Sequence, residues 1–333
     1  MFFTVIGVGV FCYGVFYSIL LCLLDCDLQL AFYEKFGKSV RRLQGKVVFI
    51  TGASSGIGEH TAIALAKHGI KLVLTARRQA ELERVKQICI TSSGGKLTNN
   101  DVLVLPMDLL DFNSHKKVFD LAVQHFGQID ILFNNAGRSQ RANWEHIDMT
   151  VDKELFDLDV FSVINLTRIA IKYFSTKGYG HVAVNSSIAG VVGAPYSGTY
   201  CGAKHAIHGY YNSLRTEKLG TDLQLTVSVI CPGPTFSNFL QESFTGTAGQ
   251  KYGNTTVSTD RRMTGERCGQ LCAVTLANKI NECWLGVFPL IPFVYVAVYF
   301  PVIRDIVLKV FGPKRLFKLR DSKDIDLSEV QAI

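Results

Sequence analysis

A tyrosine and a lysine stand four residues apart in the stretch TYCGAKHA, at Tyr200 and Lys204. On a helix this spacing places both side chains on one face, so the ammonium group would lie near the phenol. A free tyrosine has a pKa near ~10, and a neighbouring positive charge favours tyrosinate and lowers that pKa. The two residues could therefore form a proton-transfer pair. Because this spacing also arises by chance, the surrounding sequence has to show whether the two residues form such a pair.

Six short apolar runs alternate with helical patterns and end in glycine, proline or polar residues. They occupy 45–52, 71–76, 101–108, 129–137, 181–187 and 225–233. Such runs are typical of strands buried on both faces. Their alternation with helices predicts an α/β fold with a doubly wound parallel sheet, the Rossmann fold. Ligands of these sheets bind at the carboxyl ends of the strands.

A glycine-rich turn, TGASSGIG at 51–58, joins the first strand to the first helix. Gly52 permits a tight turn, Gly56 lets the backbone approach a pyrophosphate, and Gly58 allows close packing of helix on strand. The helix N-terminus adds free N–H groups and positive potential for phosphate. In this context the turn predicts a dinucleotide site, with a purely structural turn as the alternative. The expected contacts are Gly52, Ser54, Ser55, Gly56, Ile57 and Gly58.

The end of the second strand carries Arg77 and Arg78, where an NAD enzyme places an acid for the ribose 2′-hydroxyl. A guanidinium group suits an anionic 2′-phosphate instead. The sequence therefore predicts NADP(H), with Arg77 the preferred ligand, and a solvated basic helix start is the alternative. Asp108 follows the third strand, within reach of the adenine amino group. The small residues Asn135, Ala136 and Gly137 end the fourth strand and let the backbone pass close to the cofactor.

The order of these motifs is the strongest signal. A glycine turn, NNAG, Ser187 placed 13 residues before Tyr200, and then Lys204 resemble the short-chain dehydrogenase/reductase family over residues 45–238. The longer stretches ARRQAELERVK, VLVLPMDL and YCGAKHAIHGYYNSLRTE, followed by ICPGP, resemble one member of that family more closely.

The resemblance implies a role for each of these residues. Tyr200 is the general acid that protonates the carbonyl oxygen as hydride arrives from nicotinamide. Lys204 also holds the nicotinamide ribose, and Ser187 binds and orients the substrate oxygen. The stretch lining the nicotinamide carboxamide corresponds to Pro232, Gly233 and Thr235.

One position departs from the family pattern. The family usually places an asparagine on the helix after NNAG, and its main-chain carbonyl holds a water that contacts the lysine. Counting back from Thr167 along DLDVFSVINLT puts Asp159 there. A main-chain role survives this substitution, but an aspartate side chain does not hydrogen-bond like an amide. If ionised, it would strengthen the charge of Lys204. We expect activity to be retained and Asp159→Asn to keep or raise turnover.

The N-terminus predicts a membrane anchor at residues 1–24, which carry no charged side chain and are long enough to span a bilayer. The alternative is a cleaved signal peptide, which would leave the domain lumenal or secreted. Signal peptides typically have a basic start and a shorter apolar run. Basic residues follow the segment at Lys35, Lys38, Arg41 and Arg42. The positive-inside rule therefore places the domain on the cytoplasmic side, and the expected membrane is the endoplasmic reticulum.

The C-terminal region is apolar again. Trp284–Ile303 is uncharged for 20 positions but is interrupted by Pro289, Pro292 and Pro301, which favours a re-entrant or interfacial segment over a second span. The expected organisation is the anchor, a dehydrogenase domain at 45–283, and a membrane-associated extension at 284–333 whose acidic tail from Asp321 is loosely ordered. The polar stretch 241–259 predicts a mobile loop, and the family resemblance implies that the loop after Thr235, to about Gly265, covers the substrate.

The charge balance favours a membrane surface over a nucleic acid. The formal net charge is +7, and much of the excess flanks the two apolar stretches rather than clustering with aromatic residues. These flanking residues are Arg41, Arg42, Lys46, Lys314, Arg315, Lys318 and Arg320. The nine cysteines show no CxxC pair, which argues against a disulfide framework or a zinc site.

The sequence thus predicts a membrane-anchored NADP(H)-dependent oxidoreductase acting on lipophilic steroid, retinoid or similar carbonyl and hydroxyl groups. The alternative is a non-catalytic NADPH-binding membrane protein that senses the cofactor or binds a partner. Analogy with the family adds a homodimer. Of the sequons at Asn165, Asn185 and Asn254, only the last falls outside predicted buried elements, and a glycan there would place the domain in the lumen.

Overall fold

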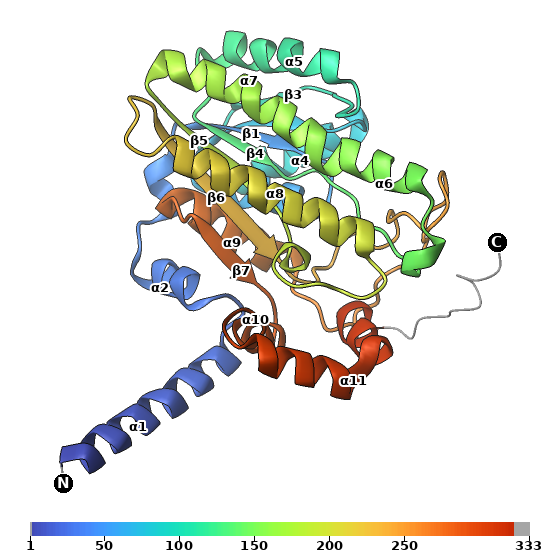
Figure 1. The fold of residues 1–333 in the computed structure, drawn as a ribbon. Helices are drawn as coiled ribbons and strands as arrows, with labels where there is room; N and C mark the ends of the chain where they lie inside the picture. Colours follow the sequence, from blue (N-terminus) through green and yellow to red (C-terminus); the bar gives the residue numbers. More distant parts are fainter. Residues whose placement is uncertain (1, 323–333) are drawn as a thin grey trace.

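The computed structural model describes residues 2–322 and centres on a seven-stranded parallel sheet with helices on both faces (Figure 1). The strand order is β3-β2-β1-β4-β5-β6-β7. The strands are β1 (Val47–Thr51), β2 (Lys71–Thr75), β3 (Val102–Val104), β4 (Ile131–Asn134), β5 (Tyr179–Asn185), β6 (Gln224–Pro232) and β7 (Glu282–Leu285). The predicted doubly wound sheet is confirmed.

Two hydrophobic cores lie on opposite faces of this sheet. One face is covered by α3 (Gly56–Ala66), α4 (Gln79–Ser92) and α9 (Gly265–Asn278), and the other by α5 (Phe112–Phe126), α7 (Ser162–Lys177) and α8 (Gly198–Glu217). Successive residues of a strand point to opposite faces. Val48 and Ile50 of β1 therefore join the first core, and Val47 and Phe49 join the second.

A π-helical turn connects two of the helices. α6 (Met149–Phe156) runs into the turn Asp157–Phe161, which continues directly into α7. A π-helical turn inserts an extra residue into a helix and redirects the side chains within it. Here it carries Asp159 to a fully buried position. Four short 3₁₀ helices lie at Val40–Leu43, Asn99–Asp101, Trp144–His146 and Ile188–Gly190.

The packed domain begins before the predicted boundary at residue 45. α1 (Phe2–Leu23) projects away from the domain (Figure 1), and its window Ile6–Leu23 is apolar enough to cross a membrane. The chain then turns onto the sheet, where the Asp27 amide donates to the carbonyl of Trp284 at 2.8 Å. α2 (Leu28–Phe36) follows and buries Leu30 completely.

The C-terminal extension corrects part of the predicted organisation. Trp284 and Leu285 belong to β7, which pairs with β6 at the sheet edge. The next helix, α10 (Leu290–Tyr299), has 10 residues, too few to cross a bilayer core of about 30 Å. α11 (Pro301–Asp321) turns sharply at Gly312, whose φ is +68°. Among residues 2–322, α1 is the helix long and apolar enough to span a membrane.

The end of α11 is held by a buried cluster of charges. Asp321 is 1% exposed, so the expectation of a loosely ordered tail is wrong at this residue, and 323–333 lie outside the described residues. Arg141 Nε donates to Asp321 Oδ2 at 2.7 Å, and Arg320 Nη2 lies 3.1 Å from the same oxygen. The Arg320 side chain therefore does not face a membrane surface. Arg262 donates to the main-chain oxygen of Asp321 at 3.0 Å.

Removing the charge of Asp321 should release α11. In Asp321→Asn the guanidinium of Arg141 stays buried without its counter-charge, a loss that typically costs about 3–5 kcal/mol. We expect faster amide hydrogen exchange along α11 and a lower melting temperature. The matched control is Asp305→Asn on the same helix, where Asp305 is 57% exposed and the expected change is negligible. Unchanged protection of α11 in Asp321→Asn would contradict this assignment.

The stability contributed by the ion pair of Asp321 with Arg141 should be lost in acid. Burial alone would raise the pKa of the Asp321 carboxyl, but Arg141 and Arg320 outweigh it and hold that pKa below its usual value. A lowered folded pKa gives stability that is complete above the unfolded value of about 3.9 and is lost as the pH falls through the folded value.

Candidate active site

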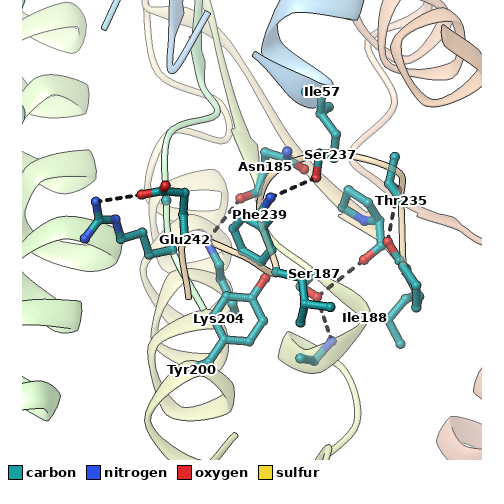
Figure 2. Close-up of a pocket in the computed structure, with 18 of the residues that line it drawn as sticks. Ile57, Asn185, Ser187, Ile188, Tyr200, Lys204, Thr235, Ser237, Phe239 and Glu242 are labelled. Carbon is teal, nitrogen blue, oxygen red and sulfur yellow. Dashed lines mark hydrogen bonds and ion pairs between the residues drawn. The ribbon is translucent and has the colours of Figure 1, made fainter. Parts of the chain in front are cut away.

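Three residues singled out in the sequence converge at the carboxyl edge of the sheet. Tyr200 and Lys204 lie on α8 and are 8% and 4% exposed, with Lys204 Nζ 5.5 Å from the centre of the Tyr200 ring. Ser187 follows β5, and its hydroxyl donates to the carbonyl of Pro232 at 3.3 Å. Figure 2 shows the three side chains together, with Phe239 packed against the Tyr200 ring at 5.9 Å.

The environment of Tyr200 differs from the sequence expectation in one respect. Burial raises the pKa of its phenol, whereas Lys204 and the neighbouring Ser187 hydroxyl lower it, and the net direction is upward. The lysine therefore acts with the predicted sign but does not dominate. The spacing of the two residues predicts the effect of the Lys204 charge. It does not predict the loss of water around the phenol, which disfavours the tyrosinate form.

Asp159 reaches the centre of this site. Its Oδ2 lies 3.0 Å from Lys204 Nζ, and its Oδ1 accepts a hydrogen bond from the Arg138 amide at 2.8 Å. A Cβ on Gly137 would lie 2.9 Å from Oδ2, so the glycine makes room for the carboxylate. The predicted effect on Lys204 has the expected direction: burial lowers the lysine pKa, but Asp159 more than offsets it and the net pKa is raised.

A cavity of about 1280 Å³ joins these residues to the glycine turn. The predicted residues that line it are Gly52, Ser54, Ser55, Gly56, Ile57, Arg77, Arg78, Asp108, Asn135, Ala136, Gly137, Ser187, Tyr200, Lys204, Pro232, Gly233 and Thr235. Two others lie behind its wall. Gly58 packs where a Cβ would meet the Gly52 carbonyl and the Asn135 amide, and Asp159 lies behind Gly137.

The cavity has features that fit a dinucleotide. Gly52 and Gly56 have φ values of +65° and +60°, which glycine adopts without steric cost, and α3 begins at Gly56 with its N-terminus at the cavity. Within the described residues, Asn185 Oδ1 and Ser186 Oγ are buried without a hydrogen-bond partner, and both residues line the cavity. Buried polar atoms normally have partners, so these two are available to a ligand.

Arg78 rather than Arg77 turns toward the glycine turn. Its Nη2 lies 3.4 Å from Ser54 Oγ and 3.3 Å from Ser55 Oγ. Both arginines are exposed and line the cavity. The preference for Arg77 stays a prediction, but these contacts favour Arg78. The sequence alone cannot show which of two adjacent arginines is the ligand, because the direction of each side chain depends on how the chain enters α4.

The sequence reading missed the far wall of the cavity. Side chains from α11 and from the loop and helix before it line this wall: Val287, Phe288, Leu290, Phe293, Val307, Leu308, Phe311, Leu316 and Leu319. Arg141, held by Asp321, lines the same region. The apolar composition of the C-terminus was visible in the sequence, but the face of each helix that meets the cavity was not.

Comparison with known proteins places the chain in a family. A family profile described as short chain dehydrogenase matches residues 46–248. The chain is 38% identical to human "Dehydrogenase/reductase SDR family member 7" over 91% of its length and 89% of that protein. It therefore belongs to the short-chain dehydrogenase/reductase family of oxidoreductases, and the predicted resemblance to SDR family member 7 is confirmed.

Other relatives agree with this assignment. "11-beta-hydroxysteroid dehydrogenase-like 2" of Arabidopsis thaliana is 35% identical over 56% of this chain and 58% of that protein. Among solved structures, an alcohol dehydrogenase from the archaeon Thermococcus sibiricus, complexed with 5-hydroxy-NADP, matches with a TM-score of 0.62 and 22% identity. The match covers 73% of this chain and 97% of the alcohol dehydrogenase chain. At this identity the likeness supports the fold.

Proposed function

We propose that this protein is a membrane-anchored, NADP(H)-dependent oxidoreductase that interconverts carbonyl and hydroxyl groups on lipophilic substrates. The observation that carries the proposal is the convergence of Ser187, Tyr200 and Lys204 at one end of a cavity whose other end is the glycine turn. This arrangement leaves room for a nicotinamide cofactor and a substrate side by side.

Each residue has a task that its position allows. Tyr200 gives its phenolic proton to the carbonyl oxygen, and the hydroxyl of Ser187, which lines the same cavity, holds that oxygen in place. Lys204 positions the nicotinamide ribose and stabilises tyrosinate after proton transfer. The cofactor supplies the hydride when it is bound. The Arg78 guanidinium, already beside Ser54 and Ser55, would bind a 2′-phosphate.

The apolar wall supports a lipophilic substrate. Val307, Leu308 and Phe311 of α11 face the cavity, and a pocket lined mainly by apolar side chains favours an apolar ligand. The name of the Arabidopsis relative, a hydroxysteroid dehydrogenase-like protein, is consistent with a steroid or a molecule of similar size. We therefore propose steroids, retinoids or similar apolar ketones, aldehydes and alcohols as the substrate class.

The membrane assignment rests on two neighbouring features. α1 leaves the domain beside α10, where Tyr17 contacts Tyr295 with ring centres 6.2 Å apart, and α11 lies along the same side (Figure 1). α11 exposes Val302, Ile306 and Val310 at 72%, 57% and 69%. An apolar helix face with Lys309, Lys314 and Arg315 exposed nearby is typical of interfacial helices.

We propose the endoplasmic reticulum, with the domain on the cytoplasmic side because basic residues follow α1. Of the three sequons, Asn165 contacts His115 in the fold and Asn185 lies in the site, whereas Asn254 is half-exposed. Glycosylation at Asn254 would therefore indicate a lumenal domain. A homodimer stays a prediction from family analogy.

A non-catalytic cofactor sensor is the second candidate, and Asp159 favours it because it departs from the family pattern. Against it stand Ser187, Tyr200 and Lys204, since a protein that only binds the cofactor has no physical need for all three. The two candidates differ in whether any carbonyl is turned over.

The first test is NADPH oxidation by the detergent-solubilised protein on a panel of steroid, retinoid and quinone carbonyls. We expect turnover with at least one, and a loss of about 10²–10⁴-fold in kcat for Tyr200→Phe, because a positioned general acid contributes about that much. Tyr210→Phe on the same helix, with Tyr210 45% exposed, is the matched control. NADPH binding without turnover on any carbonyl would favour the sensor.

The choice of cofactor can be tested separately. Arg78→Ala removes a guanidinium expected to bind the 2′-phosphate, and hydrogen bonds to charged groups contribute about 1.5–3 kcal/mol. We expect NADPH affinity, measured by fluorescence titration, to fall at least about tenfold while NADH affinity stays unchanged. Arg77→Ala is the matched control and should have the smaller effect. An equal loss for both cofactors, or a larger effect at Arg77, would argue against this ligand.

Contact between α11 and lipid can be measured in the full-length protein in vesicles. Val302→Trp should add fluorescence that lipids brominated on their acyl chains quench, because the residue would lie among those chains. Leu121→Trp, 41% exposed on α5, should add fluorescence that these lipids leave unchanged. Equal behaviour of the two variants would show that α11 does not enter the bilayer.

A further inference from the structure

Asp159 is the negative group that faces Lys204 within the described part of the chain. The carboxylate is fully buried, its Oδ1 accepts a hydrogen bond from the Arg138 amide at 2.8 Å, and its Oδ2 lies 3.0 Å from the Lys204 ammonium nitrogen as an ion pair. Burial raises the pKa of this carboxyl, whereas the Lys204 ammonium and the Arg138 amide lower it. The contacts therefore favour an ionised Asp159.

The other groups near the pair do not replace this charge. Cys231 faces Lys204 from β6, and burial raises the pKa of its thiol well above the usual value, so it stays neutral. His208 lies one turn along α8, and burial lowers the pKa of its ring, so it too is neutral near pH 7. Arg141 acts on Tyr200 as a positive group but is itself paired with Asp321.

A paired ammonium acts on a third group more weakly than a free one. The field of a close ion pair is that of a dipole, because the carboxylate cancels much of the ammonium potential at longer range. The ammonium nitrogen of Lys204 lies 5.5 Å from the centre of the Tyr200 ring. Asp159 thus opposes the stabilisation of tyrosinate that Lys204 would otherwise provide.

We propose that Asp159 is a positioning residue that offsets the charge of Lys204 and so, together with burial, disfavours the tyrosinate form of Tyr200, which suits the site to carbonyl reduction. The inference rests on the proposed oxidoreductase function and deepens it. Asp159 does not touch the reacting atoms, because it lies behind Gly137 and acts through Lys204.

The two directions need opposite forms of the tyrosine. In reduction, hydride adds to the carbonyl carbon and the Tyr200 proton goes to the oxygen, leaving tyrosinate. In oxidation, the hydroxyl proton of the substrate goes to tyrosinate as hydride leaves the carbon. Below the pKa of Tyr200 the protonated fraction is nearly constant, whereas the tyrosinate fraction falls tenfold for each unit of pH. Asp159 should therefore restrain oxidation and leave reduction almost unchanged.

The kinetic test compares Asp159→Asn with the native protein. Asparagine keeps the shape and an acceptor oxygen but removes the charge. In the alcohol direction with NADP⁺, we expect the rise of kcat/KM with pH to move about one unit lower, because an unpaired neighbouring charge shifts a pKa by about that much or more. This gives about tenfold faster oxidation below the midpoint, with reduction at neutral pH within about twofold. Asp157→Asn, an exposed position on the same π-helical turn, should leave the profile unchanged. An unmoved or alkaline-shifted profile in Asp159→Asn would overturn the proposal.

A spectroscopic test does not depend on turnover. Tyrosinate absorbs at longer wavelength than tyrosine, and subtracting the titration of Tyr200→Phe isolates Tyr200 from the 12 tyrosines of the chain. The same difference can be taken between Asp159→Asn and the double variant Asp159→Asn with Tyr200→Phe. In that difference the Tyr200 transition should occur at lower pH than in the native background. If no carbonyl is reduced, the proposed function fails, yet this titration still decides whether Asp159 controls Tyr200.

A second variant guards against misfolding of the first. Gly137→Ala would place a Cβ 2.9 Å from Asp159 Oδ2 and push the carboxylate away from Lys204, so its Tyr200 transition should move in the same direction. If the transition stays at its native position in both folded variants, Asp159 has no such role.

Discussion

The close approach of two main-chain turns is the constraint on which the rest of the site depends. A Cβ on Gly52 would lie 2.8 Å from Ala136 Cα, so the turns after β1 and β4 touch through their backbones. The Asn135 amide joins them further, since it donates to the carbonyls of Thr51 at 3.0 Å and Gly52 at 3.3 Å. Asn185 then donates to Asn135 and connects β5. The cofactor cradle and the wall beside Lys204 are therefore one rigid unit.

Two buried ion pairs are built around this unit, and they place charges rather than add much stability. The desolvation of a buried pair offsets most of its attraction, but breaking it leaves a charge without compensation. Asp159 and Lys204 therefore hold each other beside Tyr200. Arg141 and Asp321 in turn hold the end of α11 over the same cavity. In the proposed reaction, the first pair would influence the electrostatics of proton transfer, and the second would help to close the cavity in which it occurs.

The sequence predicted the parts of this architecture that depend on local pattern. The strands were visible because each is a short buried run, and the glycine turn because its spacing has a physical cause. β7 was missed because its four residues merge with the apolar stretch that follows. The burial of Asp321 was missed because its partner, Arg141, is 180 residues away. The π-helical turn explains why counting residues located Asp159 but could not show that its carboxylate faces Lys204.

In the proposed function, α11 would join the membrane surface to the cavity in a single element. Val302, Ile306 and Val310 point outward, whereas Val307 and Leu308 line the cavity. A lipophilic molecule is poorly soluble in water and concentrates in the bilayer, so we expect it to reach Tyr200 along this helix rather than through solvent. Such a route would require α11 to move, and Arg141 with Asp321 is the contact that such a movement would have to break. Substrate entry and the buried charge cluster would then be two aspects of the same structural feature.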